Sequence, residues 1–194
     1  MASKKTARKS KKRVLIQVDG SNFYHRLKER PVCLENLLQF DFAKFAKLLA
    51  NGEKIVEAVY YVGRVRAKPN DKKAMRMMGN QQRLLARLRN QGWSTSVGFI
   101  LKTDDKHHEK GVDVKIAVDV VVGAYENLYD RLILVSSDAD LLPALQVVRN
   151  KGKEIEYVGF SHAPSHALIE HATETRLLRK DDLTPFAVEK TRKK

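Results

Sequence analysis

The stretch KKRVLIQVDGSNFYHRL, residues 11–27, decides the fold of this chain. Its apolar part, RVLIQVD (13–19), has the length and composition of a buried β-strand. The strand stops on Asp19, the tripeptide Gly-Ser-Asn follows at once, and a short helix is expected after Asn22. A carboxylate and a carboxamide at such a junction either form a turn or a helix cap, or they hold a charged ligand.

Strand-like and helical patterns alternate along the rest of the chain. Apolar runs predict further strands at 54–63, 93–101, 131–137 and 153–160. Apolar residues at helical spacing predict helices at 41–52, 70–92, 112–128, 140–152 and 165–173. The polar segment 102–111 predicts a loop. This alternation predicts an α/β fold in which helices flank a central parallel sheet on both faces.

The length of 194 residues suits one folded domain with short basic ends. We expect a disordered basic arm at 1–12, a folded domain at 13–180 and a basic tail at 181–194. The net charge is +14, and residues 1–13 alone carry seven Lys and Arg and no acid. Basic arms of this kind bind phosphate backbones without reading sequence, although a purely solubilising tail is the alternative.

The composition also bears on compartment and partners. No apolar run approaches the roughly 20 residues of a membrane span, so we expect no membrane partner. The single cysteine, Cys33, excludes an intramolecular disulfide framework and is typical of a reducing compartment, which favours a cytoplasmic protein. A homodimer stays open at this stage.

The predicted helix at 70–92 has a basic face. At 100° per residue, four basic side chains fall within about 60° of one another. They are Lys72, Arg76, Arg83 and Arg87. The opposite side is expected to face the core with Met77, Met78, Leu84, Leu85 and Leu88. The segment 72–92 contains no Asp or Glu, so these basic side chains have no ion-pair partner along the helix. The basic face therefore either contacts phosphates or is an ordinary solvated surface.

Acidic residues follow two of the predicted strands. Asp19 ends the first strand, and the segment SSDAD after the fourth strand supplies Asp138 and Asp140. A further acid, Asp113, opens the helix before that strand, three residues after Lys110. Ligands of open α/β sheets bind beyond the carboxyl ends of the strands, where strand order reverses. If the first and fourth strands are neighbours, these carboxylates therefore meet in one cleft.

Clustered carboxylates repel one another, at a cost of roughly 4 kcal/mol for a pair about 4 Å apart at an effective dielectric constant near 20. A divalent cation removes this cost, and all-oxygen ligands favour Mg²⁺ or Mn²⁺ over zinc. Such a cation can activate water and stabilise the leaving oxygen of a phosphodiester. The carboxamide of Asn22 would then orient the substrate.

Each acid also has a structural alternative. Asp140 could cap the following helix, and Asp138 could accept hydrogen bonds from loop amides. Asp119 lies 120° around its helix from Asp113, so helix geometry does not bring the two into one cluster. A buried, unpaired carboxylate is costly, so Asp119 is expected to pair with Lys115 or to bind a neighbouring loop.

Three segments resemble the conserved blocks of NYN domains, a branch of the PIN-like nuclease superfamily. In chain order they are VDGSNFY, EKGVDVKIAVDVVVGAY and LILVSSDADLLPALQVVRNKG. The resemblance spans about residues 13–160 and implies a single PIN-like domain with strand order 3-2-1-4-5. The family's usual SGD reads SSD here, which is a mild departure.

The resemblance also implies metal-dependent cleavage of RNA. The residues at the matching positions are Asp19, Asn22, Asp113, Asp138 and Asp140. Asp119 matches a further acid common in the family and is a weaker candidate metal ligand. Lys110 joins the basic face of the helix at 70–92 as a candidate contact to RNA.

Two functions from different classes compete at this stage. The first is an Mg²⁺- or Mn²⁺-dependent endoribonuclease, in which the acidic cluster cleaves and the basic residues hold the RNA. The second is a non-catalytic RNA-binding or regulatory domain on the same fold. A phosphatase of the aspartyl-phosphate type is disfavoured, because DGSNF lacks the second aspartate that its nucleophile block requires.

Overall fold

A computed structural model describes residues 10–187, apart from residues 35, 66, 68–69 and 104–105, and gives only the backbone path of 99–110. Residues 1–9 of the predicted basic arm and 188–194 of the predicted tail lie outside the described residues. No helix among the described residues is long and apolar enough to cross a membrane.

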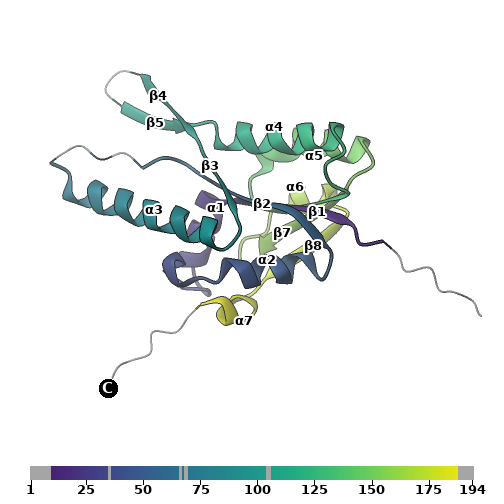
Figure 1. Ribbon diagram of the computed structural model, residues 1–194, viewed down its shortest axis with the longest axis horizontal. Helices are drawn as coiled ribbons and strands as arrows, with labels where there is room; N and C mark the ends of the chain where they lie inside the picture. The colour runs from purple at the N-terminus through teal and green to yellow at the C-terminus, as the bar shows by residue number, and fades with distance from the viewer. Residues whose placement is uncertain (1–9, 35, 66, 68–69, 104–105, 188–194) are drawn as a thin grey trace, which may run out of the picture.

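The centre of the molecule is a six-stranded sheet, and all of its neighbouring strands are parallel (Figure 1). The strands are β1 (Arg13–Asp19), β2 (Lys54–Val62), β3 (Ser94–Val97), β6 (Arg131–Val135), β7 (Glu154–Phe160) and β8 (Glu174–Leu178). Their order is β3-β2-β1-β6-β7-β8. The five predicted strands therefore adopt the predicted order 3-2-1-4-5, and β8 adds a sixth strand at the edge.

Helices cover both faces of the sheet, as predicted (Figure 1). On one face lie α1 (Gly20–Lys28), α2 (Phe42–Ala50), α3 (Lys72–Asn90) and α7 (Lys180–Leu183). On the other face lie α4 (Val112–Tyr125), α5 (Leu142–Asn150) and α6 (His166–His171). Short 3₁₀ turns complete the structure: η1 (Leu37–Gln39), η2 (Ala139–Leu141) and η3 (Thr184–Phe186).

Strand β1 separates two hydrophobic cores because its side chains alternate between the faces of the sheet. Val14, Ile16 and Val18 pack into the core under α1 and α2, which contains a cluster of buried phenylalanines. Leu15 packs into the core under α4 and α5. Burial on both faces explains why this strand reads as a nearly continuous apolar run.

Two elements differ from the predictions. The segment predicted as a polar loop, 102–111, forms most of an antiparallel hairpin of β4 (Phe99–Thr103) and β5 (Lys106–Lys110). The hairpin projects away from the sheet and its covering helices (Figure 1). Strands that lie away from a hydrophobic core do not need an alternating apolar pattern, so the sequence did not indicate them. Strand β8 escaped prediction because it is an edge strand, in which Leu178 alone is buried.

The folded part of the chain extends beyond residue 180. Leu183 and Phe186 are buried against the phenylalanine cluster, and the carbonyl of Phe186 accepts a hydrogen bond from the backbone N–H of Asp41 at 2.8 Å. The basic tail predicted from residue 181 therefore begins with an ordered segment that closes one core.

Gly20 lies where the sheet allows no side chain. A Cβ atom at this position would lie 2.2 Å from a ring carbon of Tyr60 and 2.5 Å from the carbonyl oxygen of Tyr61. The carbonyl belongs to the backbone of β2 and cannot move without disturbing the sheet. Close packing of α1 against β2 therefore requires glycine directly after Asp19.

Replacing Gly20 with alanine is expected to destabilise the protein by about 1–3 kcal/mol, because the added methyl group overpacks this contact. The matched control is Gly79→Ala in α3, where a Cβ would meet no atom within 4 Å. The control is expected to stabilise the helix by roughly 0.5–1 kcal/mol. Urea unfolding measures both changes, and a stable Gly20→Ala protein would contradict the packing described here.

Candidate metal centre

Three carboxylates converge at the carboxyl end of the central strands. Asp19, Asp113 and Asp138 each offer an oxygen, and these three oxygens lie within 4.8 Å of one another. In the part of the chain that the structure describes, no other group of three or more His, Cys, Asp or Glu side chains has this geometry. Asp19 is buried, Asp138 is half-buried and Asp113 is exposed.

The parallel pairing of β1 with β6 brings Asp19 and Asp138 together. Asp19 caps α1, because its Oδ1 accepts a hydrogen bond from the N–H of Asn22 at 3.0 Å. Its Oδ2 accepts from the hydroxyl of Ser136 at 3.1 Å. The same hydroxyl oxygen accepts from the N–H of Asp138 at 3.1 Å. Ser136 therefore links the ends of the two strands and holds both acids in place.

The loop after β6 is held from two sides. The Oδ1 of Asn22 accepts from the N–H of Ser137 at 3.1 Å, so this carboxamide positions the loop that carries Asp138. Asp138 in turn caps η2, because its Oδ1 accepts from the N–H of Asp140 at 2.9 Å. Asp138 therefore accepts a hydrogen bond from a loop amide, as the structural alternative predicted, and it also belongs to the acidic cluster. Asp140 is exposed and is not one of the three converging acids.

Asp113 reaches the cluster from the opposite layer. It is the second residue of α4, which begins directly after Gly111, and the φ of Gly111, 97°, lies in the left-handed region that favours glycine. Although Asp113 is exposed as a residue, partial desolvation of its carboxylate by the surrounding protein raises its pKa, and the charges of Asp19, Asp138 and Asp140 raise it further. Burial likewise raises the pKa of Asp19, partly offset by its hydrogen bonds to Asn22 and Ser136.

A cleft of about 380 Å³ opens over the three acids. Besides the acids, it is lined by Ser21, Asn22, His25, Gly111 and Val112. Sequence reasoning did not single out Ser136, His25 or Gly111. A glycine immediately before a predicted helix could have identified Gly111, and the SSD motif already contains Ser136, whereas nothing in the sequence relates His25 to a metal site.

Asp119 lies outside the cluster, as helix geometry predicted. Its carboxylate forms an ion pair with Lys115, which confirms the predicted pairing. The hydroxyl of Tyr61 donates a second hydrogen bond to it, 2.8 Å long. The pKa of Tyr61 is raised, mainly by burial and to a lesser extent by this hydrogen bond to a carboxylate. Asp119 therefore belongs to a groove beside α4, next to the metal centre but separate from it.

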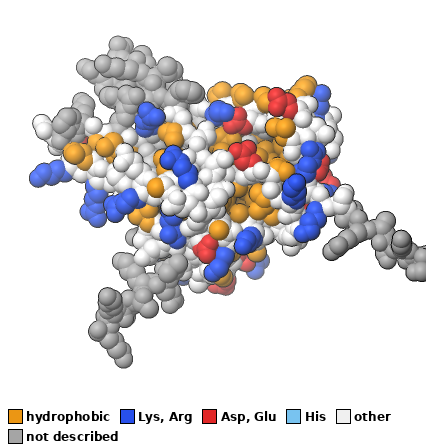
Figure 2. Space-filling model, in the orientation of Figure 1, with side chains coloured by type: hydrophobic (Ala, Val, Ile, Leu, Met, Phe, Trp, Pro, Cys, Tyr) orange, Lys and Arg blue, Asp and Glu red, His pale blue; other side chains and the backbone are white. Residues whose placement is uncertain are grey.

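The basic face of α3 is partly as predicted. Lys72, Arg76 and Arg83 are exposed, and Figure 2 shows Lys and Arg side chains lying over this helix. Arg87 differs, because it is partly buried and its Nε donates to the carbonyl of Phe40 at 3.3 Å. Lys110 is the last residue of β5, and its side chain lies outside what the structure describes.

The opposite side of α3 is only partly as predicted. Leu88 is buried and Leu84 and Leu85 pack against the core, but Met77 is 50% exposed and Met78 is only half-buried. The reason is visible in Figure 1, where the first half of α3 runs beyond the edge of the sheet and has no core to face.

The fold and the acidic cluster define a PIN-like α/β domain. Residues 13–178 match the NYN domain family, and the chain belongs to this PIN-like nuclease family. No curated protein sequence matches the chain.

Two solved structures are similar to the chain. A protein of unknown function from Vibrio parahaemolyticus has a TM-score of 0.68 and 23% sequence identity, over 93% of this chain and 98% of that chain. The T5 5′-exonuclease with bound zinc has a TM-score of 0.45 and 16% identity, over 81% of this chain and 60% of that chain. The first of these similarities supports the fold alone.

The three acids fit a divalent cation. All their donor atoms are carboxylate oxygens, which suit a hard cation. The raised pKa values of Asp19 and Asp113 reflect burial and mutual repulsion, and a bound cation would relieve the repulsion. Hydrogen bonds from Asn22, Ser136 and Asp140 fix two of the three carboxylates from behind.

Removing the charge of Asp113 is expected to stabilise the metal-free protein. A pKa that is raised on folding means that the ionised group opposes folding at neutral pH. Asp113→Asn should therefore raise Tm in EDTA at pH 7, and the gain should disappear as the pH falls to about 4, near the unfolded pKa of aspartate.

The matched control for this measurement is Asp181→Asn, an exposed aspartate on α7. It should leave Tm unchanged at both pH values. A lower Tm for Asp113→Asn at pH 7 would show that the three carboxylates do not repel one another in the folded protein.

Proposed function

We propose that this chain is an endoribonuclease that requires Mg²⁺ or Mn²⁺. The observation that carries the proposal is the convergence of the Asp19, Asp113 and Asp138 oxygens within 4.8 Å in a cleft, in a chain of the NYN domain family. These acids come from three separate segments, and the molecule bears the cost of their repulsion. A cluster that only stabilised the fold would not need three like charges.

The acids and the carboxamide at the cleft receive separate roles in this proposal. Asp19, Asp113 and Asp138 hold the cation through their carboxylate oxygens. When bound, the cation would activate the attacking water and neutralise charge that develops on the phosphate and the leaving oxygen. Asp140, exposed on η2, is a fourth acid that lies beside the three-carboxylate cluster. The amide nitrogen of Asn22 is the donor that we assign to a phosphate oxygen of the substrate.

The exposed basic residues of α3 are assigned to the RNA backbone. Lys72, Arg76 and Arg83 carry positive charge on one stretch of this helix, and the described acids of the cleft would otherwise repel a polyanion. Arg87 is left out of this set, because its guanidinium binds the carbonyl of Phe40. The basic residues supply affinity without sequence preference, since phosphate contacts carry no base information.

Cleavage of labelled single-stranded and structured RNA tests the catalytic proposal. With Mn²⁺ or Mg²⁺ the wild-type protein should cut internally, and EDTA should stop the reaction. Asp138→Asn should lower the rate by at least about 100-fold, because it removes one ligand of the cation but keeps the size of the side chain. The matched control, Asp181→Asn, should cut like the wild type.

Metal binding is measured separately from catalysis. Mn²⁺ should raise the Tm of the wild type and of Asp181→Asn, because a ligand that binds only the folded state stabilises it. The rise should be smaller for Asp138→Asn. Binding of RNA without cutting in either metal would contradict the proposal and favour the non-catalytic RNA-binding domain.

The basic face of α3 is tested by the salt dependence of RNA binding. Affinity falls with log salt at a slope that reflects the number of phosphates neutralised. The triple change of Lys72, Arg76 and Arg83 to Gln should reduce this slope by about 2, at roughly 0.7 for each phosphate contact on a single strand. Changing Lys44, Lys47 and Lys54 instead leaves the slope unchanged if α3 is the contact surface, and an equal reduction would overturn the assignment.

A further inference from the structure

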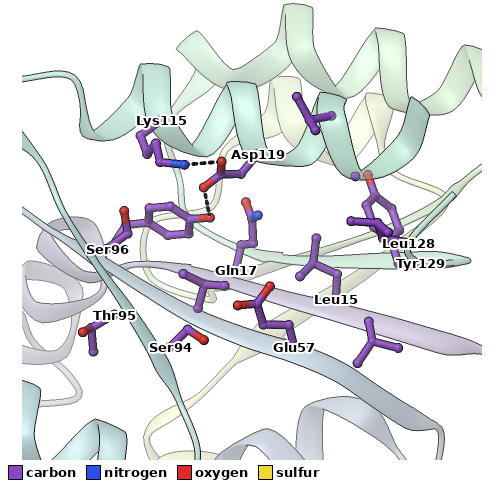
Figure 3. A pocket seen from close by; sticks show the side chains of 15 residues that line it. Leu15, Gln17, Glu57, Ser94, Thr95, Ser96, Lys115, Asp119, Leu128 and Tyr129 are labelled. Carbon is purple, nitrogen blue, oxygen red and sulfur yellow. Dashed lines mark hydrogen bonds and ion pairs between the residues drawn. The ribbon is translucent and has the colours of Figure 1, made fainter. Parts of the chain in front are cut away.

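A groove of about 590 Å³ runs along α4 next to the metal centre (Figure 3). Helices α1, α2 and α3 cover the face of the sheet that lies opposite α4. Strands β2 and β3 are therefore left open on the face that α4 covers over β1 and β6. Figure 2 shows hydrophobic side chains with acidic ones among them in this area, between α4 and β2. The volume lies within the range of about 300–1,000 Å³ that is typical of small-ligand sites.

The groove contains a buried polar group without a partner. Gln17 is 1% exposed, and its Oε1 has no hydrogen-bond partner among the described residues. In Figure 3 its side chain points from β1 toward α4, between Asp119 and Leu15. Buried carboxamides are normally hydrogen-bonded, because an unpaired buried acceptor costs free energy. A glutamine on an otherwise apolar strand is therefore a group that is suited to bind something in the groove.

The surroundings of Gln17 favour a flat ligand with N–H donors. The floor consists of Leu15, Val59 and the ring of Tyr61, which together form an apolar surface. The exposed carboxylate of Glu57 is an acceptor on the wall, and the hydroxyls of Ser94, Thr95 and Ser96 can accept or donate. Because the only described cation of the lining, Lys115, is already paired with Asp119, phosphate groups would be repelled.

We propose that this groove binds an adenine base. A glutamine carboxamide pairs with adenine in a bidentate manner, because it accepts from the exocyclic amine and donates to a ring nitrogen. The apolar floor offers a surface on which the base can stack. Uracil presents carbonyl oxygens where adenine presents an amine, and the carboxylate of Glu57 would repel them. Adenine is therefore favoured over uracil.

The position of the groove relates it to the metal centre. Gln17 and Asp19 are alternate residues on the same face of β1, which places them roughly 7 Å apart. Tyr61, in the floor of the groove, is the direct neighbour of Asp19 in the register of β1 and β2. If the base belongs to an RNA substrate, which rests on the proposed function, the groove would hold a nucleotide close to the one that is cut.

Binding measurements in EDTA test the adenine site without cleavage. Short oligoadenylate should bind the full-length wild-type protein about tenfold more tightly than oligouridylate of equal length, as one bidentate base contact provides. Gln17→Leu, which keeps the volume but removes the hydrogen bonds, should abolish this difference. The matched control is Gln146→Leu, a glutamine on the exposed side of α5, which should keep it. The base could come from an RNA strand or from a free nucleoside. Binding of adenosine alone distinguishes the two, since tighter binding of oligoadenylate than of adenosine assigns the groove to RNA.

A second variant keeps the test valid if Gln17→Leu does not fold. Ser94 is exposed on the edge strand and lines the groove, so Ser94→Phe should block the groove without disturbing the core. It too should abolish the preference for oligoadenylate. Equal binding of both RNAs by the wild type would overturn the adenine site, and so would a folded Ser94→Phe protein that keeps the preference for oligoadenylate. Metal-dependent cleavage could persist in either case, so this failure differs from failure of the proposed function.

Discussion

The parallel pairing of β1 with β6 at the centre of the sheet is the constraint on which the site depends. Strand order reverses here, since the chain builds outward from β1 in one direction through β2 and β3, and in the other through β6 and β7. The carboxyl ends of two central strands therefore open onto one cleft. Asp19 and Asp138 are brought together by this pairing, although they are far apart in sequence.

Hydrogen bonds from uncharged groups make the cluster tolerable in the folded protein. Ser136 contacts both Asp19 and Asp138, and Asn22 contacts Asp19 through its backbone and the next loop through its side chain. These bonds orient the carboxylates and by themselves lower the pKa of Asp19, but its burial raises the pKa by more than they lower it. The folded protein thereby tolerates a cluster of like charges whose geometry suits a divalent cation, and perturbed carboxylates of this kind are common at functional sites.

Helix α4 contributes to two neighbouring regions because its polar residues lie on different sides. Asp113, in its first turn, faces the metal centre, whereas Asp119 lies over the groove, where it binds Lys115 and Tyr61. Strand β1 has a corresponding pair in Asp19 and Gln17. The acidic cluster and the groove therefore share β1 and α4, and the loop after β6 adds Asp138 to the cluster.

The sequence alone determined the α/β class, and it offered Lys115 as one of two partners for Asp119, because burial on both faces makes strands apolar and helix spacing fixes which side chains are neighbours. The strand order 3-2-1-4-5 was implied by the resemblance to NYN domains, and of the acids expected to meet, Asp140 does not join the three that converge. Only the tertiary structure decided the roles of Ser136 and Gln17, the exposure of Met77 and the hairpin at 99–110. Each of these depends on what lies opposite a residue in space, and contacts between distant segments leave no periodic signal in the chain.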